Sequence, residues 1–160
     1  NLSPAQFLVF LEDIDLEQGP AQVIPGSHRG KIFDHYDDND QWLGYIPNTH
    51  LEEIDSDNAV ALTGPAGTVT GHHGLTVHSS KQNLSDRGRP LLITGFNASD
   101  ALPYTAPAYP SSYHGTVIRG EQTRYAHLEP APIRLPPDGS GGYTSIFSHQ
   151  TGAGEQLTTG

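Results

Sequence analysis

The chain alternates short apolar runs with long polar stretches rich in glycine and proline. Runs of four to eight apolar or alternating residues between turn signals are typical of β-strands. No segment repeats apolar residues at the 3.6-residue period of a long helix, and only Leu51-Glu52-Glu53-Ile54 is predicted as a helical turn. We therefore expect an all-β chain with strands at residues 7–14, 21–24, 60–62, 67–70, 75–79, 91–97 and 116–119, and one near Ile133.

Length and loop pattern predict a single domain over residues 1–150, followed by a flexible tail at 151–160. The long connections are residues 34–57 and 100–115. Long loops on a β scaffold often bind substrate, and the second connection carries several tyrosines beside prolines. The tyrosines considered are Tyr104, Tyr109 and Tyr113. They either form an aromatic wall of the substrate site or are exposed loop residues.

The formal net charge of −10 argues against nucleic acid or an anionic membrane surface as a partner. Most of the 18 acidic residues fall between Glu12 and Asp57, which indicates an acidic loop region. The chain has no cysteine, so disulfides and thiol chemistry are excluded, and no apolar run is long enough to span a membrane. We expect a cytoplasmic protein with a small-molecule partner.

The segment from His78 to Arg89 combines an imidazole, a hydroxyl and a guanidinium. Read with the two-residue period of a strand, Thr76, His78 and Ser80 lie on one face. A reversal through residues 83–86 brings Arg89 back beside His78. Imidazole is a natural ligand for iron, and the guanidinium fork matches a carboxylate. The pattern predicts a site that holds a metal together with a small organic acid.

An acidic turn with glycine at residues 15–20 is followed by a short strand that ends in Pro25-Gly26-Ser27-His28. The later strand ends in His78, and Asn83 and Arg89 follow it. These two ordered motifs closely resemble the phytanoyl-CoA dioxygenase family. The resemblance implies an iron(II)- and 2-oxoglutarate-dependent dioxygenase on a double-stranded β-helix, a cupin-like jelly roll.

The resemblance extends over about residues 7–100 and implies roles for three side chains. His78 matches the distal histidine of the family's 2-His-1-carboxylate iron site. Arg89 matches the residue that clamps the distal carboxylate of 2-oxoglutarate, and Ser80 a hydroxyl partner of that carboxylate. The implied cofactors are Fe(II), 2-oxoglutarate and O2, and the implied reaction hydroxylates a small organic molecule and releases succinate and CO2. Beyond the metal site the resemblance gives no catalytic residue, substrate or oligomeric state.

The family's His-x-Asp/Glu motif, which lies upstream of Pro-Gly-Ser-His, has no match in residues 1–24. We therefore expect residues 1–150 to be the C-terminal portion of an N-terminally incomplete domain. A literal His-x-Asp occurs at His35-Tyr36-Asp37, in a polar run that favours a solvated loop over a metal site. The alternative function is a non-catalytic jelly-roll binding protein that lacks a complete metal triad.

Other histidines near the two motifs are weaker candidates. His28 belongs to the Pro-Gly-Ser-His turn, where a structural hydrogen bond is expected rather than metal binding. His73 opposes His78 in an unbroken strand, whereas His72 has the same parity as His78. Bulges at the neighbouring glycines can change this count, so either His72 or His73 is a candidate to line the pocket.

Three further charged residues compete with these candidates. Arg87 lies two residues before Arg89, and the spacing from His78 favours Arg89 as the clamp, with Arg87 at an exposed turn. Asp13 and Asp15 are possible metal-binding carboxylates. The family resemblance instead places both aspartates in a structural turn.

Overall fold

The structure is a computed structural model that describes residues 4–106, 111–130 and 132–138. The chain divides into two compact units, and each is described by itself. The first unit comprises Asn1–Ile32 and Asp55–Ala101, and the second comprises Phe33–Ile54 and Leu102–Gly160. All six strands of the described residues belong to the first unit. Tyr109 and the tail predicted at 151–160 lie outside the described residues.

The first sheet is antiparallel and has the strand order β4-β1-β6. Its members are β1 (Ala5–Phe10), β4 (Val69–His73) and β6 (Leu91–Phe96). The central strand β1 pairs Leu8 with Thr70 on one side and with Ile93 on the other. Residues directly opposite in a sheet share a face, so Leu8 and Thr70 lie on the same face of this sheet.

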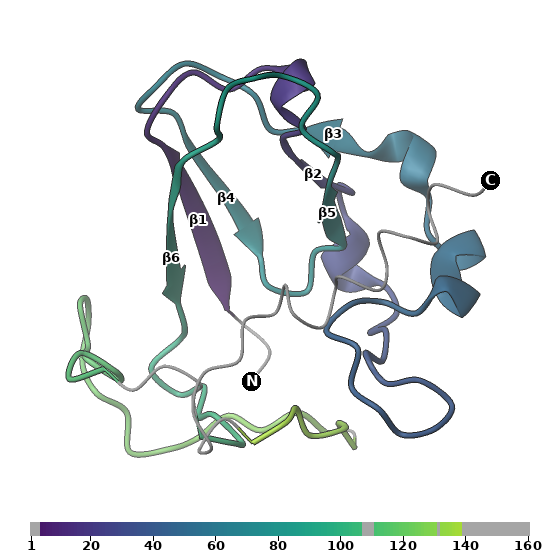
Figure 1. Cartoon of the computed structure of the whole chain (residues 1–160). Coiled ribbons are helices and arrows are strands. Elements are labelled where there is room, and N and C mark those ends of the chain that lie inside the picture. Colours follow the sequence, from purple (N-terminus) through teal and green to yellow (C-terminus); the bar gives the residue numbers. More distant parts are fainter. Residues whose placement is uncertain (1–3, 107–110, 131, 139–160) are drawn as a thin grey trace. The chain divides into compact units, whose positions relative to one another are not determined.

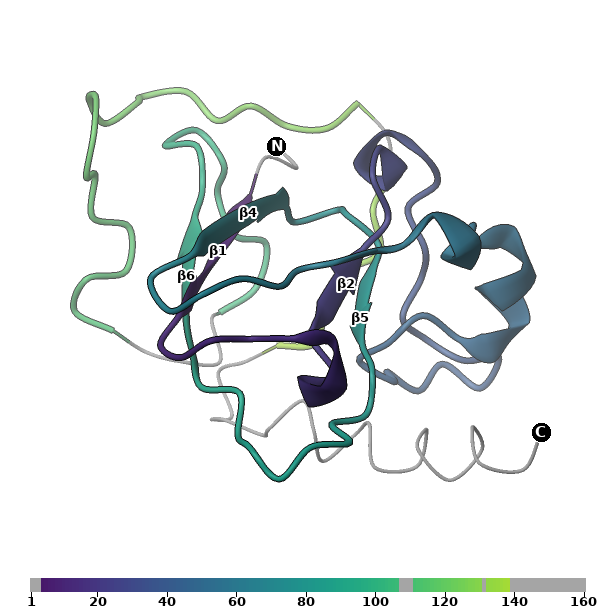
Figure 2. The same ribbon diagram turned by 90° about the horizontal axis from the view of Figure 1, so that it is seen from above.

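The second sheet has the order β3-β2-β5 and is also antiparallel. It consists of β2 (Ala21–Val23), β3 (Val60–Ala61) and β5 (His78–Ser80). Figures 1 and 2 show it beside the first sheet, with the chain descending β4, turning, and returning through β5. The edge strand β4 of the first sheet is thus joined by one short turn to β5, the strand that carries His78.

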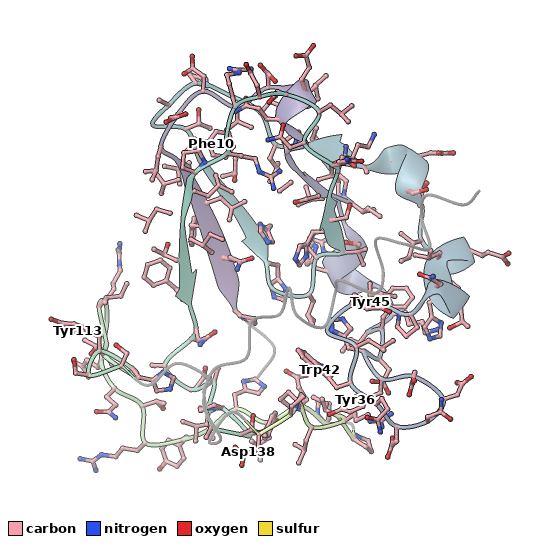
Figure 3. All side chains as sticks on the ribbon, viewed as in Figure 1. Phe10, Tyr36, Trp42, Tyr45, Tyr113 and Asp138 are labelled. Atoms are coloured by element: carbon pink, nitrogen blue, oxygen red, sulfur yellow. The ribbon has the colours of Figure 1, made fainter. Side chains whose placement is uncertain are left out.

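The apolar core is small and joins the two sheets. Leu8, Phe10 and Ile14 are buried, and Phe10 is only 2% exposed. Phe10 is the last residue of β1 and is labelled in Figure 3. Ala21 from the second sheet packs against this cluster together with Leu62 and Leu91. Burial of apolar side chains supplies most of the stabilisation of a fold, so this cluster holds the two sheets together.

Four short 3-10 helices complete the described secondary structure: η1 (Leu16–Gln18), η2 (Ser27–Arg29), η3 (Asn48–Glu53) and η4 (Ser56–Asn58). The first is closed by a capping box, in which the Asp15 carboxylate accepts from the Glu17 N–H and the Gln18 side chain accepts from the Asp15 N–H. Gly19 ends it with φ of 60°. A Cβ there would lie 2.3 Å from the Lys81 carbonyl oxygen, so only glycine fits.

In the second unit, Arg134 ties the acidic loop to a later segment. Its guanidinium lies 3.8 Å from the centroid of the Tyr36 ring and pairs with Asp34 and Asp40. The Tyr36 hydroxyl donates to the Leu135 carbonyl at 3.2 Å. Figure 3 shows Tyr36 in the same loop as Trp42, with which it forms an isolated β-bridge. Two ion pairs and a cation–π contact thus hold this loop, although its charges are largely exposed.

The expectation of a mainly β chain is confirmed, with differences in detail. The predicted strand at 67–70 is β4 and runs on to His73, while residues 75–77 of the next predicted strand belong to a turn. The strands predicted at 116–119 and near Ile133 are wrong, because these residues form turns or irregular backbone. Ile118 is 72% exposed there, so its apolar run has no partner face to cover. The helical turn predicted at 51–54 falls in η3. Among the described residues, no helix combines the length and apolar character needed to cross a membrane.

Candidate active site

The Pro-Gly-Ser-His turn positions the strand end that carries His78. Gly26 adopts φ of 82°, which lets the chain turn sharply into η2. The Ser27 hydroxyl donates to the Ile24 carbonyl at 2.8 Å and accepts from the Val77 N–H at 2.9 Å. This hydroxyl therefore fixes the residue directly before His78 against the end of β2.

His78 is oriented by its own backbone. Its Nδ1 lies 2.8 Å from the Thr76 carbonyl oxygen. A carbonyl only accepts, so Nδ1 carries the proton and Nε2 keeps its lone pair. This is the arrangement by which metal-binding histidines are commonly held, with one ring nitrogen on a backbone carbonyl and the other on the metal. The exposed His78 ring thus fits the donor set of an iron site.

His72 faces His78 from the other sheet. The centroids of the two rings are 5.3 Å apart. Both ring nitrogens of His72 are buried, and neither has a hydrogen-bond partner within the described part of the chain. Burial lowers the pKa of the His72 imidazole, and the neighbouring His78 lowers it further, which favours the neutral ring. Of the two candidates for a pocket-lining histidine, His72 is the one beside His78.

His73 points away from His78 and has a structural environment. Its Nδ1 accepts from the Leu75 N–H at 3.1 Å, which shapes the turn between β4 and β5. Its ring lies 5.4 Å from the ring of His28, measured between centroids. His72 and His73 are consecutive residues of β4 and therefore face opposite sides of the sheet.

Arg89 lies beside Ser80, at the end of β5 opposite to His78. One guanidinium nitrogen donates to the Gly19 carbonyl, and the other lies 3.4 Å from the Ser80 hydroxyl oxygen. The Arg89 side chain is half-buried, and no carboxylate among the described residues is paired with it. A guanidinium anchored by a carbonyl and a hydroxyl keeps donors that can hold an incoming carboxylate.

The turn between Ser80 and Arg89 is held by side-chain hydrogen bonds. The Asn83 amide donates to the Arg87 carbonyl at 2.7 Å and its oxygen accepts from the Ser85 N–H at 2.9 Å. From η1, the buried Gln18 donates to the Gly88 carbonyl at 2.8 Å. These bonds fix the backbone on both sides of the turn, so Arg89 starts from a defined position.

Arg87 lies outside this arrangement. It forms an ion pair with Asp15, in which both side chains are about half exposed. The hydrogen bond from Arg87 holds the pKa of the Asp15 carboxyl below its ordinary value. The neighbouring Asp13 accepts from the Ala66 N–H at 2.8 Å. Both aspartates therefore hold the turn, as the family resemblance implied.

No group of three or more His, Cys, Asp or Glu side chains within the described ranges is placed to hold a metal ion. His35 and Asp37 belong to the second unit. The Asp37 carboxylate accepts from the N–H groups of Asn39 and Gln41 and thereby closes its own loop, which also lowers its pKa. Those bonds agree with the solvated-loop interpretation of this His-x-Asp.

Sequence reasoning missed three residues of the site region, which are Gln18, Gly19 and Thr70. Gln18 and Gly19 hold the segment that ends in Arg89, and their signal was the Asp15-x-x-Gln18-Gly19 pattern of a capping box followed by a helix-ending glycine. Thr70 has a buried hydroxyl without a partner among the described residues. Its signal was a polar residue at a position whose parity matches His72.

Two curated relatives share about a third of their residues with this chain. "Probable alpha-ketoglutarate-dependent hypophosphite dioxygenase" of Stutzerimonas stutzeri is 32% identical over 130 residues, which are 80% of this chain and 46% of that protein. "L-proline trans-4-hydroxylase" of Streptomyces griseoviridis is 32% identical over 110 residues, 59% of this chain and 41% of that protein. The chain spans less than half the length of these two relatives.

Among solved structures, EvdO2 from Micromonospora carbonacea var. aurantiaca complexed with 2-oxoglutarate is similar, with 25% identity and a TM-score of 0.44. The match covers 57% of this chain and 37% of that one. The family model of phytanoyl-CoA dioxygenase (PhyH) matches residues 3–91, which include β1, both histidines of β4, and the whole segment from His78 to Arg89. On this match over more than half of its residues, the chain belongs to the phytanoyl-CoA dioxygenase family.

Proposed function

We propose that this chain forms part of an iron(II)- and 2-oxoglutarate-dependent dioxygenase that hydroxylates a small organic molecule and releases succinate and CO2. One observation carries the proposal: a single turn brings Arg89 to Ser80, two residues from an oriented His78. A metal-binding imidazole and a carboxylate clamp at that separation suit a ligand that chelates a metal at one end and carries a carboxylate at the other.

His78 supplies one metal ligand in this proposal. Its Nε2 lone pair is available because the Thr76 carbonyl holds the proton on Nδ1. When bound, iron(II) with 2-oxoglutarate supplies the oxidising chemistry of the hydroxylation. The residues of this chain contribute by fixing ligand positions, which the bonds of Ser27 and Thr76 do for His78.

Arg89 and Ser80 bind the distal carboxylate of 2-oxoglutarate. The Gly19 carbonyl accepts from one guanidinium nitrogen, and the Ser80 hydroxyl lies beside the other. The remaining N–H groups of Arg89 and the Ser80 hydroxyl can donate to the carboxylate. Charge-assisted bonds of this type are about twice as strong as neutral ones. The half-buried position of Arg89 limits competition from water.

The fold that we propose for the complete site is a double-stranded β-helix, with the two three-stranded sheets as part of its walls. The antiparallel sheets and the cross-sheet core of Leu8, Phe10 and Ala21 support it. In such folds ligands bind between the sheets, and the polar side chains of β4 and β5 meet there.

The substrate class is a small polar molecule. The names of the two relatives refer to hypophosphite and L-proline, both small and polar. The net charge of −10 disfavours nucleic acid as a substrate. Neither relative's substrate is assigned to this protein.

The test uses the natural full-length protein, loaded anaerobically with Fe(II) and titrated with 2-oxoglutarate. We expect the visible charge-transfer band of an iron–2-oxoglutarate complex, and succinate formation on exposure to O2 with a panel of small polar compounds. Glutarate, which lacks the keto group, is the matched control and should give no band. Absence of the band in a folded, iron-loaded protein would contradict the proposal and favour the non-catalytic binding protein.

A further inference from the structure

The inner face of β4 carries buried polar atoms that nothing in the described structure satisfies. They are the Thr70 hydroxyl and both ring nitrogens of His72. Leaving such a group unpaired lowers stability, so native proteins retain one where a ligand or water completes it. Valine at position 70 would have the same shape without this cost. The two residues therefore indicate a polar occupant next to β4.

The position of that occupant follows from the strand directions. The chain runs down β4 to the turn at 74–77 and returns through β5, so the two strands run in opposite directions (Figure 1). His72 faces His78 across the interior. Moving two residues back along β4 reaches Thr70, and moving two forward along β5 reaches Ser80. Both steps span about 6.6 Å, so Thr70 lies at the level of Ser80.

We propose that Thr70 and His72 form a second wall of the 2-oxoglutarate site, opposite His78, Ser80 and Arg89. The inference rests on the proposed function and extends it to the other sheet. His72 donates to an oxygen of the keto acid end, which lies beside His78. Thr70 donates to the distal carboxylate, which Arg89 and Ser80 hold from the other side. A five-carbon diacid places acceptors at both ends, at a spacing that suits two donors two residues apart on a strand.

His72 as a metal ligand is the competing interpretation, since its ring lies beside His78. The family's other two ligands are expected from a His-x-Asp/Glu motif, and β4 contains no Asp or Glu. A binding residue and a metal ligand also predict different losses. Removing a residue that binds 2-oxoglutarate lowers the affinity for 2-oxoglutarate and leaves the affinity for iron unchanged. Removing a metal ligand lowers the affinity for iron itself.

The experiment compares three variants of the natural full-length protein with wild type. Thr70→Val and His72→Phe remove the donors while keeping side-chain size. Thr94→Val is the matched control, because Thr94 pairs with Phe7 on the opposite face of the same sheet. Iron affinity is measured by equilibrium dialysis, and 2-oxoglutarate affinity by anaerobic titration of the visible band.

We expect each β4 variant to bind 2-oxoglutarate about ten- to a hundredfold more weakly, as for loss of one hydrogen bond to a charged group. Iron affinity should stay at the wild-type value, and Thr94→Val should match wild type in both. Thermal unfolding checks the fold, and both β4 variants should be at least as stable as wild type because they lose an unpaired buried group.

The outcomes separate this inference from the proposed function. A wild-type protein without the band would refute the function itself. If wild type gives the band and Arg89→Ala weakens it, but both β4 variants titrate like wild type, the second wall alone is refuted. Loss of iron in His72→Phe would also refute it, since His72 would then be a ligand.

Discussion

The interior between the two sheets has one apolar end and one polar end. At the apolar end, Leu8 and Phe10 of β1 are buried against Ala21. At the polar end, Gln6 of the same strand stands opposite His72, whose ring faces His78. The first region stabilises the fold, whereas the second carries polar atoms whose burial lowers stability unless a ligand is bound. Buried polar side chains on the same strand as the apolar core therefore indicate a ligand-binding site at the polar end.

The largest effect is expected from removing His78, the proposed metal ligand at the polar end. We predict that His78→Ala abolishes iron(II) binding by the natural full-length protein, since one of only three protein ligands is lost. His50→Ala is the control, because His50 bonds to Glu53 in the second unit. Anaerobic equilibrium dialysis with metal analysis measures the loss. Wild-type iron affinity in a folded His78→Ala protein would show that the assignment is wrong.

Breaking the apolar end should change stability and leave the site's chemistry intact. Phe10→Ala is expected to lower the free energy of unfolding by about 3–5 kcal/mol, because Phe10 is 2% exposed and its removal leaves a cavity. Leu92→Ala, at a residue that is 52% exposed on the outer face of β6, should cost far less. Denaturant unfolding followed by circular dichroism compares them. A parallel fall in iron affinity of folded Phe10→Ala would show that the two ends are not independent.

The third prediction concerns the clamp, which lies between the two ends. Arg89→Ala should weaken the binding of 2-oxoglutarate by about 2–5 kcal/mol, or about thirty- to several-thousand-fold in affinity. The affinity for iron should stay nearly unchanged. Arg89→Lys should restore only part of the loss, because a point charge does not reproduce the guanidinium fork. Anaerobic titration of the visible band measures both variants.

Arg87→Ala is the control for the clamp. It should leave the 2-oxoglutarate titration nearly unchanged and raise the pKa of the Asp15 carboxyl toward its ordinary value, since the hydrogen bond from Arg87 is the largest cause of its depression. Stability from this pair is present above the ordinary pKa of aspartate and is lost as the pH falls, so any effect of the variant disappears in acid. If Arg87→Ala lowers the affinity for 2-oxoglutarate more than Arg89→Ala does, Arg87 is the clamp and Arg89 is not.

The sequence predicted the strands of the first unit well, because their apolar runs face a core. The six described strands all fall in or next to predicted runs, although β4 begins two residues later and ends three residues later than expected. The runs at 116–119 and near Ile133 misled the prediction, because periodicity does not reveal whether a partner strand exists. In the first of these runs, Val117 and Ile118 are exposed instead.

The residues of the candidate site also differ in whether the sequence alone could predict them. His78, Ser80 and Arg89 were chosen from one continuous segment and a family motif, and the structure brings Arg89 to Ser80. Thr70 and Gln18 depend on contacts between segments far apart in the sequence. Gln18 bonds to Gly88 across 70 positions, which a single sequence does not reveal.

The turn from Ser80 to Arg89 also sets a length. Asn83 closes it from within, and Gln18 and Gly19 fix its far side. In the proposed site, this turn therefore sets the distance between the His78 imidazole and the Arg89 guanidinium, and with it the length of the diacid that could bind to both. A one-residue deletion inside the turn is then expected to favour a diacid of another chain length, even with every contacting side chain unchanged.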